Sequence, residues 1–249
     1  MKMVILAGGQ KSAISGEAEG VPKPMIQIGG RPLLWHIMKH ASLCGIKEFI
    51  ICGGYKIEQI KEYFRDFYVY QSDIAINIET NTVKILKKNL EDWNVIVADT
   101  GLTTSPIGRV KMVQKYIEDD SFLLSYGDCL TDLCFQSLEE NFKNSNRMMT
   151  VAVAHPSGRK VPLSIDNFRN SAGISQKIND VWTSAGIFVI RKELLSKVEV
   201  EGEIEEILYT FDSDQISVYK HDGFWNTIET LRDKVASEHM WERGDAPWI

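Results

Sequence analysis

The chain has 249 residues, of which 44% are hydrophobic and 25% are charged, and its formal net charge is −6. This composition is ordinary for a globular protein with enough apolar material for a sizeable core. The negative charge gives no electrostatic support for nucleic-acid binding. No apolar stretch is long enough to cross a bilayer, and the N-terminus lacks the pattern of a signal peptide. We therefore expect a cytoplasmic protein with no membrane and no nucleic-acid partner.

The first predicted element is a buried parallel strand over residues 2–7, which are apolar after Lys2. It runs into Gly8 and Gly9, which allow the backbone to approach a ligand closely. In open α/β sheets, ligands bind at the carboxyl ends of the strands. Lys23 follows between two prolines that restrict its backbone, and it can supply positive charge to a phosphate.

Strands and helices then alternate along the chain. Helices are predicted over residues 32–44, 57–67 and 110–117, and strands over 48–52, 75–78, 94–98 and 122–126. This alternation predicts an α/β fold with a mainly parallel sheet flanked by helices. Beyond residue 150 the pattern is more mixed, with strands predicted over 150–154 and 185–190 and helices over 203–211 and 230–241.

The last of these helices is amphipathic, with Leu231, Val235 and Met240 on one side. It would form a small C-terminal helical appendage. No repeat, linker or low-complexity run divides the chain, so one domain over residues 1–249 is the economical interpretation.

Cysteines and histidines give little sign of a metal site. Cys44, Cys52, Cys129 and Cys134 form no Cys-x-x-Cys pair, so we expect reduced thiols. His36 and His40 lie four apart in a predicted helix and could share a metal, but a third ligand is not apparent and a structural role is favoured.

Two carboxylates and one loop could carry chemistry. Asp128 follows a buried strand in Tyr126-Gly127-Asp128, where it is well placed to hold Mg²⁺, although an aspartate of an ordinary turn would look the same. Glu229 lies in an aromatic segment and alone would pass for a helix-start charge. Residues 99–109 are rich in hydroxyls and end in Arg109, so they either bind a nucleotide or form a surface loop that caps a helix.

Taken together, these motifs resemble those of the glucose-1-phosphate cytidylyltransferases, which are sugar-phosphate nucleotidylyltransferases. The matching stretches keep their order along the whole chain and include Val4-Ile5-Leu6-Ala7-Gly8-Gly9, Pro22-Lys23-Pro24-Met25, Tyr126-Gly127-Asp128, Gly223-Phe224-Trp225, Thr230-Leu231-Arg232-Asp233-Lys234 and Ala246-Pro247-Trp248. The resemblance implies a Rossmann-like nucleotidyltransferase fold. It also implies a reaction that joins CTP to a small phosphorylated acceptor and releases pyrophosphate.

The resemblance further implies a role for each matching position. Residues 1–130 would form the nucleotide-binding half, 131–229 the acceptor-binding half, and 230–249 a C-terminal helix and tail. Lys23 and Asp128 would be catalytic, Asp128 and Glu229 would hold Mg²⁺, and Lys177 would meet the acceptor phosphate. The implied nucleotide-binding residues are Leu6, Ala7, Gly8, Gly9, Gln10, Lys11, Ser12, Ala13, Lys23, Thr104, Arg109 and Gly127.

The phosphate loop departs from the family's Gly-Gly-x-Gly-Thr-Arg-Leu. Ser12 keeps the hydroxyl of the threonine, but Ala13 replaces the arginine and so removes a bidentate phosphate clamp. Our hypothesis is that Lys11 substitutes for that arginine, and an unchanged CTP affinity in Lys11→Ala would contradict it. Glu229 stands where the family usually has aspartate, and its longer side chain can still bring an oxygen to Mg²⁺.

The acceptor half departs further. The usual Glu-Lys-Pro is Gln176-Lys177-Ile178, the usual Asn-Gly-Gly is Ser184-Ala185-Gly186, and the usual Gly-Arg-Phe-Gly is Gly158-Arg159-Lys160-Val161. Losing several sugar-binding groups together argues against glucose 1-phosphate as the acceptor. The cations of Arg159 and Lys160 would suit a substrate carboxylate.

Three functional hypotheses follow from these departures. The divergent motifs resemble those of the CTP:phosphoglutamine cytidylyltransferases of the capsular phosphoramidate pathway, in capsule polysaccharide biosynthesis, which implies L-glutamine phosphate as acceptor. The alternatives are a glucose-1-phosphate cytidylyltransferase that makes CDP-glucose and a non-catalytic nucleotide-binding regulatory protein. Because relatives assemble, we also expect a homo-oligomer, in which Trp241 and Trp248 could pack on a neighbour.

Overall fold

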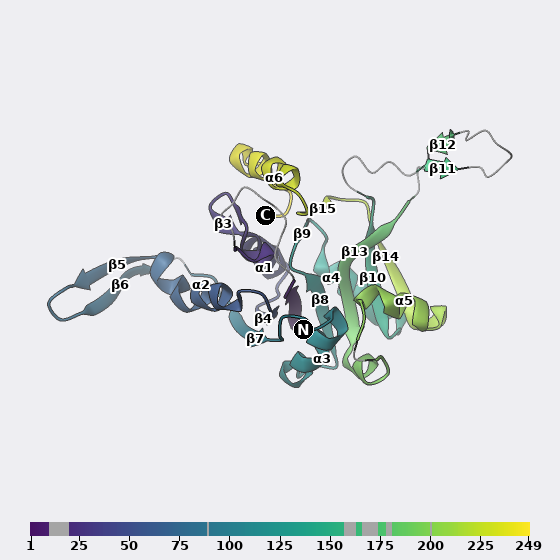
Figure 1. The fold of residues 1–249 in the computed structure, drawn as a ribbon, viewed down its shortest axis with the longest axis horizontal. Coiled ribbons are helices and arrows are strands. Elements are labelled where there is room, and N and C mark those ends of the chain that lie inside the picture. Colours follow the sequence, from purple (N-terminus) through teal and green to yellow (C-terminus); the bar gives the residue numbers. More distant parts are fainter. Residues whose placement is uncertain (10–19, 89, 157–162, 166–173, 178–180, 200) are drawn as a thin grey trace.

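A seven-stranded sheet forms the centre of the molecule in the computed structural model, which describes residues 1–9, 20–88, 90–156, 163–165, 174–177, 181–199 and 201–249 (Figure 1). The strand order is β14-β10-β13-β8-β1-β4-β7. The bounds are β1 (Met3–Ala7), β4 (Glu48–Gly53), β7 (Asn94–Asp99), β8 (Ser121–Tyr126), β10 (Met149–Ala154), β13 (Thr183–Arg191) and β14 (Ile216–His221). Neighbouring strands are parallel except on either side of β13. The predicted mainly parallel α/β sheet is confirmed.

The central strands are apolar on both faces because helices cover both sides of the sheet. In β1, Met3 and Ile5 pack into one buried cluster and Val4 and Leu6 into the other, as the period of two of a strand requires. The first cluster includes helices α1 (Leu33–Leu43), α2 (Ile57–Tyr70) and α4 (Phe135–Ser145). The second includes helix α3 (Pro106–Val113) and the short helix α5 (Ile207–Thr210).

Helix α3 begins four residues earlier than the sequence pattern predicts. Ser105 is its N-cap, and the Ser105 Oγ accepts a hydrogen bond from the Gly108 N–H at 3.3 Å. Pro106 follows as the first helical residue, where its missing N–H costs nothing. The hydroxyl-rich loop thus does cap a helix, and it places Arg109 on that helix rather than in the loop.

The strand predicted over residues 75–78 is present as β5 (Ser72–Asn77), but it lies outside the central sheet. The chain there forms a separate two-stranded hairpin of β5 and β6 (Thr82–Lys88), which extends from the end of α2 away from the sheet (Figure 1). The turn is made locally, since the Asn77 Oδ1 accepts from the Thr80 N–H at 2.9 Å and Asn81 has φ +51°. Periodicity alone does not say which sheet a strand joins.

The remaining short elements lie outside the central sheet. The predicted helix over 203–211 is broken into a 3₁₀ turn, η4 (Ile204–Glu206), followed by the single turn of α5. Small antiparallel pairs are formed by β2 (Gln27–Ile28) with β3 (Arg31–Pro32), β9 (Cys129–Thr131) with β15 (Trp225–Thr227), and β11 (Leu163–Ile165) with β12 (Ile174–Lys177). The other 3₁₀ turns are η1 (Lys23–Met25), η2 (Gln114–Tyr116), η3 (Lys192–Ser196) and η5 (Ser213–Gln215).

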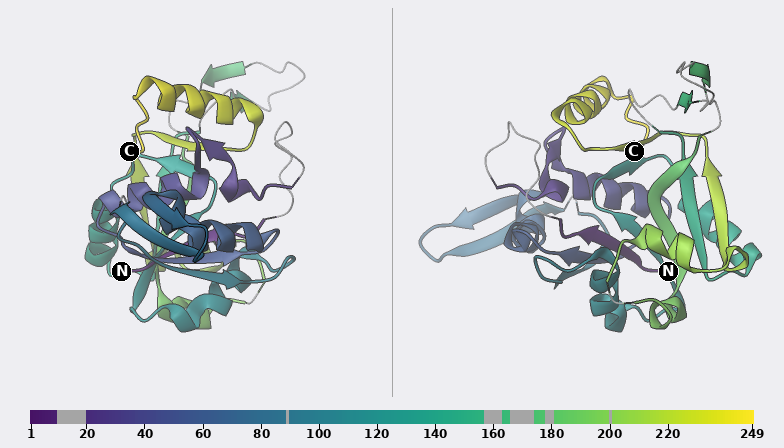
Figure 2. Two further views of the ribbon diagram at one scale, coloured as in Figure 1. Left: turned by 90° about the vertical axis from the view of Figure 1, so that its left-hand side faces the viewer. Right: turned by 45° about the vertical axis from the view of Figure 1, so that its right-hand side comes forward.

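The C-terminal helix α6 (Leu231–Arg243) packs beside the small antiparallel pair of β2 and β3 (Figure 2). Thr230 and Asp233 close its start with a capping box. The predicted apolar side of this helix is only partly correct, because Met240 packs on the core whereas Leu231 and Val235 remain 47% and 43% exposed.

The C-terminal tail packs inside its own chain, which corrects the expectation that Trp248 contacts a neighbour. Trp248 is fully buried, and its Nε1–H donates to the His36 Nδ1 at 3.1 Å. The Trp241 ring packs edge-on against His36, with 4.8 Å between centroids. The His36 Nε2–H donates to the Ile28 carbonyl at 2.8 Å. His36 is therefore structural, as favoured from the sequence, and His40 likewise bonds the Leu133 carbonyl.

The four cysteines are free thiols, as predicted. Within the described part of the chain, no helix combines the length and apolarity needed to span a bilayer.

Candidate functional site

A pocket of about 490 Å³ opens where β1 and β8 end at their carboxyl termini, and we call it the glycine pocket. It brings together every described residue that the sequence analysis assigned to the nucleotide. These residues are Leu6, Ala7, Gly8, Gly9, Lys23, Thr104, Arg109 and Gly127. Tyr126 and Glu203 also line it, and the sequence analysis missed both.

A side chain at position 8 would occupy the space of a buried guanidinium, which explains the glycine there better than a turn does. A Cβ at Gly8 would lie 2.1 Å from the Arg109 Nη1, and one at Gly54 would lie 2.9 Å from the same atom. The glycines after β1 and β4 therefore leave room for the Arg109 side chain between the strand ends.

The Arg109 guanidinium hydrogen-bonds the loop that forms one wall of the glycine pocket. Its side chain is buried, and its Nη1 donates to Thr100 Oγ1 at 2.7 Å and to the carbonyls of Gly101 and Gly53 at 2.8 and 3.2 Å. Its Nη2 donates to the Leu102 carbonyl at 3.2 Å. Burial lowers the pKa of Arg109 from its usual range. The guanidinium is thus engaged with the backbone of the loop that leads to Thr104, and through that loop it shapes one wall of the glycine pocket.

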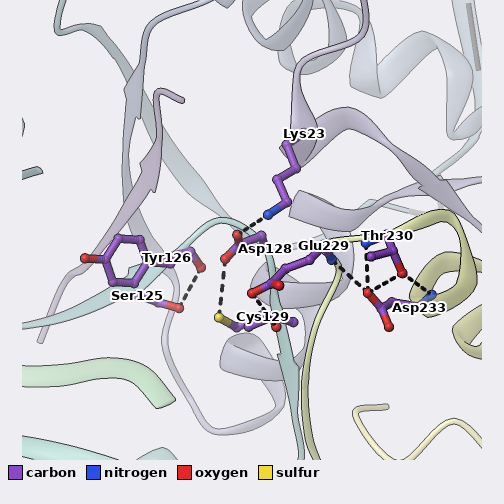
Figure 3. A network of polar contacts seen from close by, with 9 residues as sticks. Lys23, Ser125, Tyr126, Asp128, Cys129, Glu229, Thr230 and Asp233 are labelled. Atoms are coloured by element: carbon purple, nitrogen blue, oxygen red, sulfur yellow. Dashed lines mark hydrogen bonds and ion pairs between the residues drawn. The ribbon is translucent and has the colours of Figure 1, made fainter. Parts of the chain in front are cut away.

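Lys23 and Asp128 form an ion pair at the base of the glycine pocket (Figure 3). The Lys23 Nζ lies 2.6 Å from the Asp128 Oδ2, and the Cys129 thiol donates to the other oxygen at 3.4 Å. The residue before the aspartate is a glycine, and a Cβ added to Gly127 would lie 2.9 Å from the Leu6 carbonyl oxygen. The Gly127 N–H donates a hydrogen bond to the same oxygen at 2.9 Å. The structure therefore brings together the two residues predicted to be catalytic.

A second pocket of about 610 Å³ lies on the other side of Asp128, and we call it the carboxylate pocket. Asp128, Glu205 and Glu229 all line it. The Glu229 side chain points toward Asp128, and its Oε1 accepts from the Thr227 Oγ1 at 3.3 Å (Figure 3). The pairing of β9 with β15 and the bond from the Ile228 N–H to the Asp128 carbonyl, at 2.9 Å, bring these distant segments together.

The donor set of Asp128 and Glu229 fits Mg²⁺. Mg²⁺ is usually held by one or two carboxylates together with substrate phosphates and water. Among the residues that the structure describes, there is no group of three or more His, Cys, Asp or Glu side chains placed as a metal cage. Asp128 and Glu229 therefore bring two carboxylates to one pocket, which is a donor set of the kind that Mg²⁺ uses.

Several predicted site residues fall outside the described residues. Gln10, Lys11, Ser12 and Ala13 of the phosphate loop are among them, so the Lys11 hypothesis stays a prediction. Arg159 and Lys160 are also outside. For Lys177 only the backbone is described, as the end of β12 paired with Leu163.

Comparison with known proteins decides the family. Over its whole length the chain is 38% identical to a glucose-1-phosphate cytidylyltransferase of Salmonella typhi, and the match covers 98% of that protein. The chain belongs to the glucose-1-phosphate cytidylyltransferase family. A probable glucose-1-phosphate cytidylyltransferase of Bacillus subtilis (strain 168) is 31% identical, over 100% of this chain and 99% of its own length. The family described as "MobA-like NTP transferase domain" matches residues 3–196. The protein is thus a nucleotidyltransferase of the sugar-phosphate cytidylyltransferase type.

Solved structures of nucleotidyltransferases confirm the fold of this cytidylyltransferase family member. The crystal structure of HddC from Yersinia pseudotuberculosis superimposes with a TM-score of 0.71 at 19% identity, covering 96% of this chain and 99% of that one. An inositol-1-phosphate CTP transferase from T. maritima gives a TM-score of 0.63 at 15% identity, covering 99% of this chain and 95% of that one. The Rossmann-like fold expected from the resemblance is therefore correct.

Proposed function

We propose that the protein transfers the cytidylyl group of CTP to the phosphate of a small acceptor, with Mg²⁺, and releases pyrophosphate. The observation that carries this proposal is that the glycine pocket and the carboxylate pocket share Tyr126 and Asp128 as a common wall. A nucleotide in the first pocket and an acceptor in the second would meet beside the Lys23–Asp128 ion pair.

The chain's own groups would act by positioning and by charge neutralisation. The acceptor phosphate oxygen is already a nucleophile, so attack on the α-phosphorus needs no covalent enzyme intermediate. The Lys23 ammonium would neutralise charge that develops on the reacting phosphate. Bound Mg²⁺, held by Asp128 and Glu229, would add Lewis-acid stabilisation of the same charge. The Arg109-supported loop would hold the nucleotide in line.

Glucose 1-phosphate is the first candidate acceptor, because the full-length relatives from Salmonella typhi and Bacillus subtilis are named for it. L-glutamine phosphate is the second. It is favoured by the changed acceptor motifs, in which Ser184 replaces the family's asparagine, and the Ser184 Oγ–H donates to Glu205. Such a protein would act in the capsular phosphoramidate pathway.

The test is pyrophosphate release with CTP and Mg²⁺, with glucose 1-phosphate and L-glutamine phosphate compared at equal concentration. UTP, dTTP and GTP replace CTP in parallel reactions. Turnover with either acceptor that needs both CTP and Mg²⁺ supports the proposal, and the preferred acceptor assigns the product. No pyrophosphate with either acceptor, from a protein that still binds CTP, would argue for the regulatory alternative.

We also propose that the protein is a homo-oligomer, as expected from its relatives. Exposed Ile76 and Val83 lie directly opposite each other on one face of the β5–β6 hairpin, and an apolar face of this kind is commonly covered by a partner. Light scattering of the wild type and of Ile76→Ser tests this, since a monomer in both would contradict it. Cytoplasmic location also remains a proposal, with which the four free thiols agree.

A further inference from the structure

The Glu205 carboxylate is held at a fixed position in the carboxylate pocket by two hydroxyl groups. The Tyr126 hydroxyl donates to its Oε2 at 2.8 Å, and the Ser184 hydroxyl donates to its Oε1 at 3.0 Å. Burial, followed by the nearby Glu205 charge, raises the pKa of Tyr126, so the phenol stays protonated and remains a donor. Glu205 itself lies on the 3₁₀ turn η4 and is only half-buried.

The backbone around Gly186 supports this arrangement. Gly186 has φ +69°, and a Cβ there would lie 2.7 Å from the Tyr126 ring. The Gly186 N–H donates to the Ser184 Oγ at 3.1 Å. The same glycine therefore leaves space for the Tyr126 ring and orients the Ser184 hydroxyl, so that both donors converge on Glu205. A carboxylate held by two oriented hydroxyl groups in this way is preorganised to bind a ligand.

Glu205 lies at the end of the carboxylate pocket where the Tyr126 hydroxyl is found. The Tyr126 ring, whose hydroxyl contacts Glu205, points away from the Asp128 carboxylate and Lys23 (Figure 3). Each carboxylate oxygen can accept a second hydrogen bond after the first. Two accepting oxygens thus remain for a ligand at this end of the pocket.

Charge determines what this end of the pocket can bind. Among its described lining residues, the carboxylate pocket contains Asp128, Glu205 and Glu229 but no lysine, arginine or histidine. A phosphate placed against Glu205 would meet like charge, whereas N–H or O–H donors would meet complementary charge.

We propose that Glu205 is the specificity-determining residue for the acceptor, and that it accepts hydrogen bonds from donor groups at the end remote from the acceptor phosphate. This inference rests on the proposed function, because it assigns the acceptor to the carboxylate pocket. Two acceptor classes present such donors: a phosphorylated amino acid through its ammonium group and a sugar phosphate through adjacent hydroxyls.

The test uses Glu205→Gln, with Glu206→Gln as matched control. Gln replaces one accepting oxygen by a donating NH₂, so it cannot serve Tyr126, Ser184 and the acceptor together. Glu206 is the next residue of the same turn, is exposed and lines neither pocket. The KM and kcat of pyrophosphate release, the KM for CTP and the calorimetric affinity for each acceptor are measured with both variants and the wild type.

We expect Glu205→Gln to raise the acceptor KM, while the CTP KM stays within about twofold of the wild type and the thermal midpoint is unchanged. The rise should be about tenfold or more for an ammonium acceptor and should shrink at high salt, because a charge pair is lost. For a hydroxyl acceptor it should be about two- to fivefold and insensitive to salt.

Equal acceptor KM values in Glu205→Gln and Glu206→Gln would overturn the inference while leaving the proposed function intact. If the wild type releases no pyrophosphate, the proposed function fails. The inference is then tested by calorimetry alone, and the affinity for a bound acceptor must still fall in Glu205→Gln. An affinity unchanged by that substitution, or no binding of either acceptor, would overturn the inference as well.

Discussion

Lowering the pH below about 6.5 should destabilise the fold through the buried imidazole of His36. The neutral ring is fully matched to its neighbours: its Nε2–H donates to the Ile28 carbonyl, and its Nδ1 accepts from the Trp248 Nε1–H. A second ring proton would point at the indole N–H and leave two donors facing each other. Burial, with a smaller contribution from the charge of Arg31, lowers the pKa of His36 from 6.5 to about 4.

The magnitude follows from these two pKa values. A group whose pKa is lower in the folded state binds protons better when unfolded, so folding loses stability as the pH falls. The contribution is complete above the unfolded-state pKa, 6.5, and is lost progressively as the pH falls toward about 4, below which it levels off. At about 1.4 kcal/mol per pKa unit, the full loss amounts to about 3 kcal/mol.

The assay is urea unfolding at several pH values between 7.5 and 4.5, comparing the wild type with His36→Gln. The substitution removes the titrating group, so the difference in unfolding free energy between the two proteins should shrink by about 2 to 3 kcal/mol over this range. His239→Gln is the control, since His239 is exposed on α6 and should leave the wild-type profile unchanged. Parallel profiles for the wild type and His36→Gln would refute the reasoning.

Three further substitutions test other parts of the structure. Arg109→Lys should lower the urea-derived unfolding free energy by about 2 to 4 kcal/mol, because a lysine cannot serve the four acceptors of the guanidinium, and should raise the CTP KM about tenfold. Gly8→Ala should weaken the CTP affinity measured by calorimetry at least tenfold, because the added Cβ would displace that guanidinium. Gly9→Ala should change the free energy of unfolding little, because a Cβ at Gly9 would meet no atom within 4 Å. Trp248→Phe should cost about 1 kcal/mol and raise the pKa of His36 measured by NMR, because the donor to Nδ1 is lost.

The fold of the N-terminal half could be predicted because its signals are local. The apolar residues of β1 and β4 are buried on both faces, and such strands read as continuous apolar runs. The β5–β6 hairpin could not be placed in the same way, because β-branched residues indicate a strand without naming its partner. The start of α3 was obscured by Thr-Thr-Ser-Pro, which is equally typical of a loop and of a helix cap.

The sequence predicted which residues would meet at the site, but it did not predict what each side chain contacts there. Gly8, Lys23 and Gly127 follow strands or a proline-restricted turn, so their convergence could be expected from parallel topology. The role of Arg109 could not, because a guanidinium that binds phosphate and one that binds carbonyls have the same sequence signal. Glu205 was missed because it lies in an acidic run, Glu203 to Glu206, that looks like a solvated surface.

The bond between His36 and Trp248 joins residues 212 positions apart in the chain. During synthesis, the pocket around His36 and the Ile28 carbonyl therefore exists without the indole that fills it until nearly the whole described chain has left the ribosome. At about 5 to 20 residues per second, that interval is roughly 10 to 40 s. Over this time the surface of α1 that Trp248 covers in the folded protein lacks its partner from the C-terminal tail.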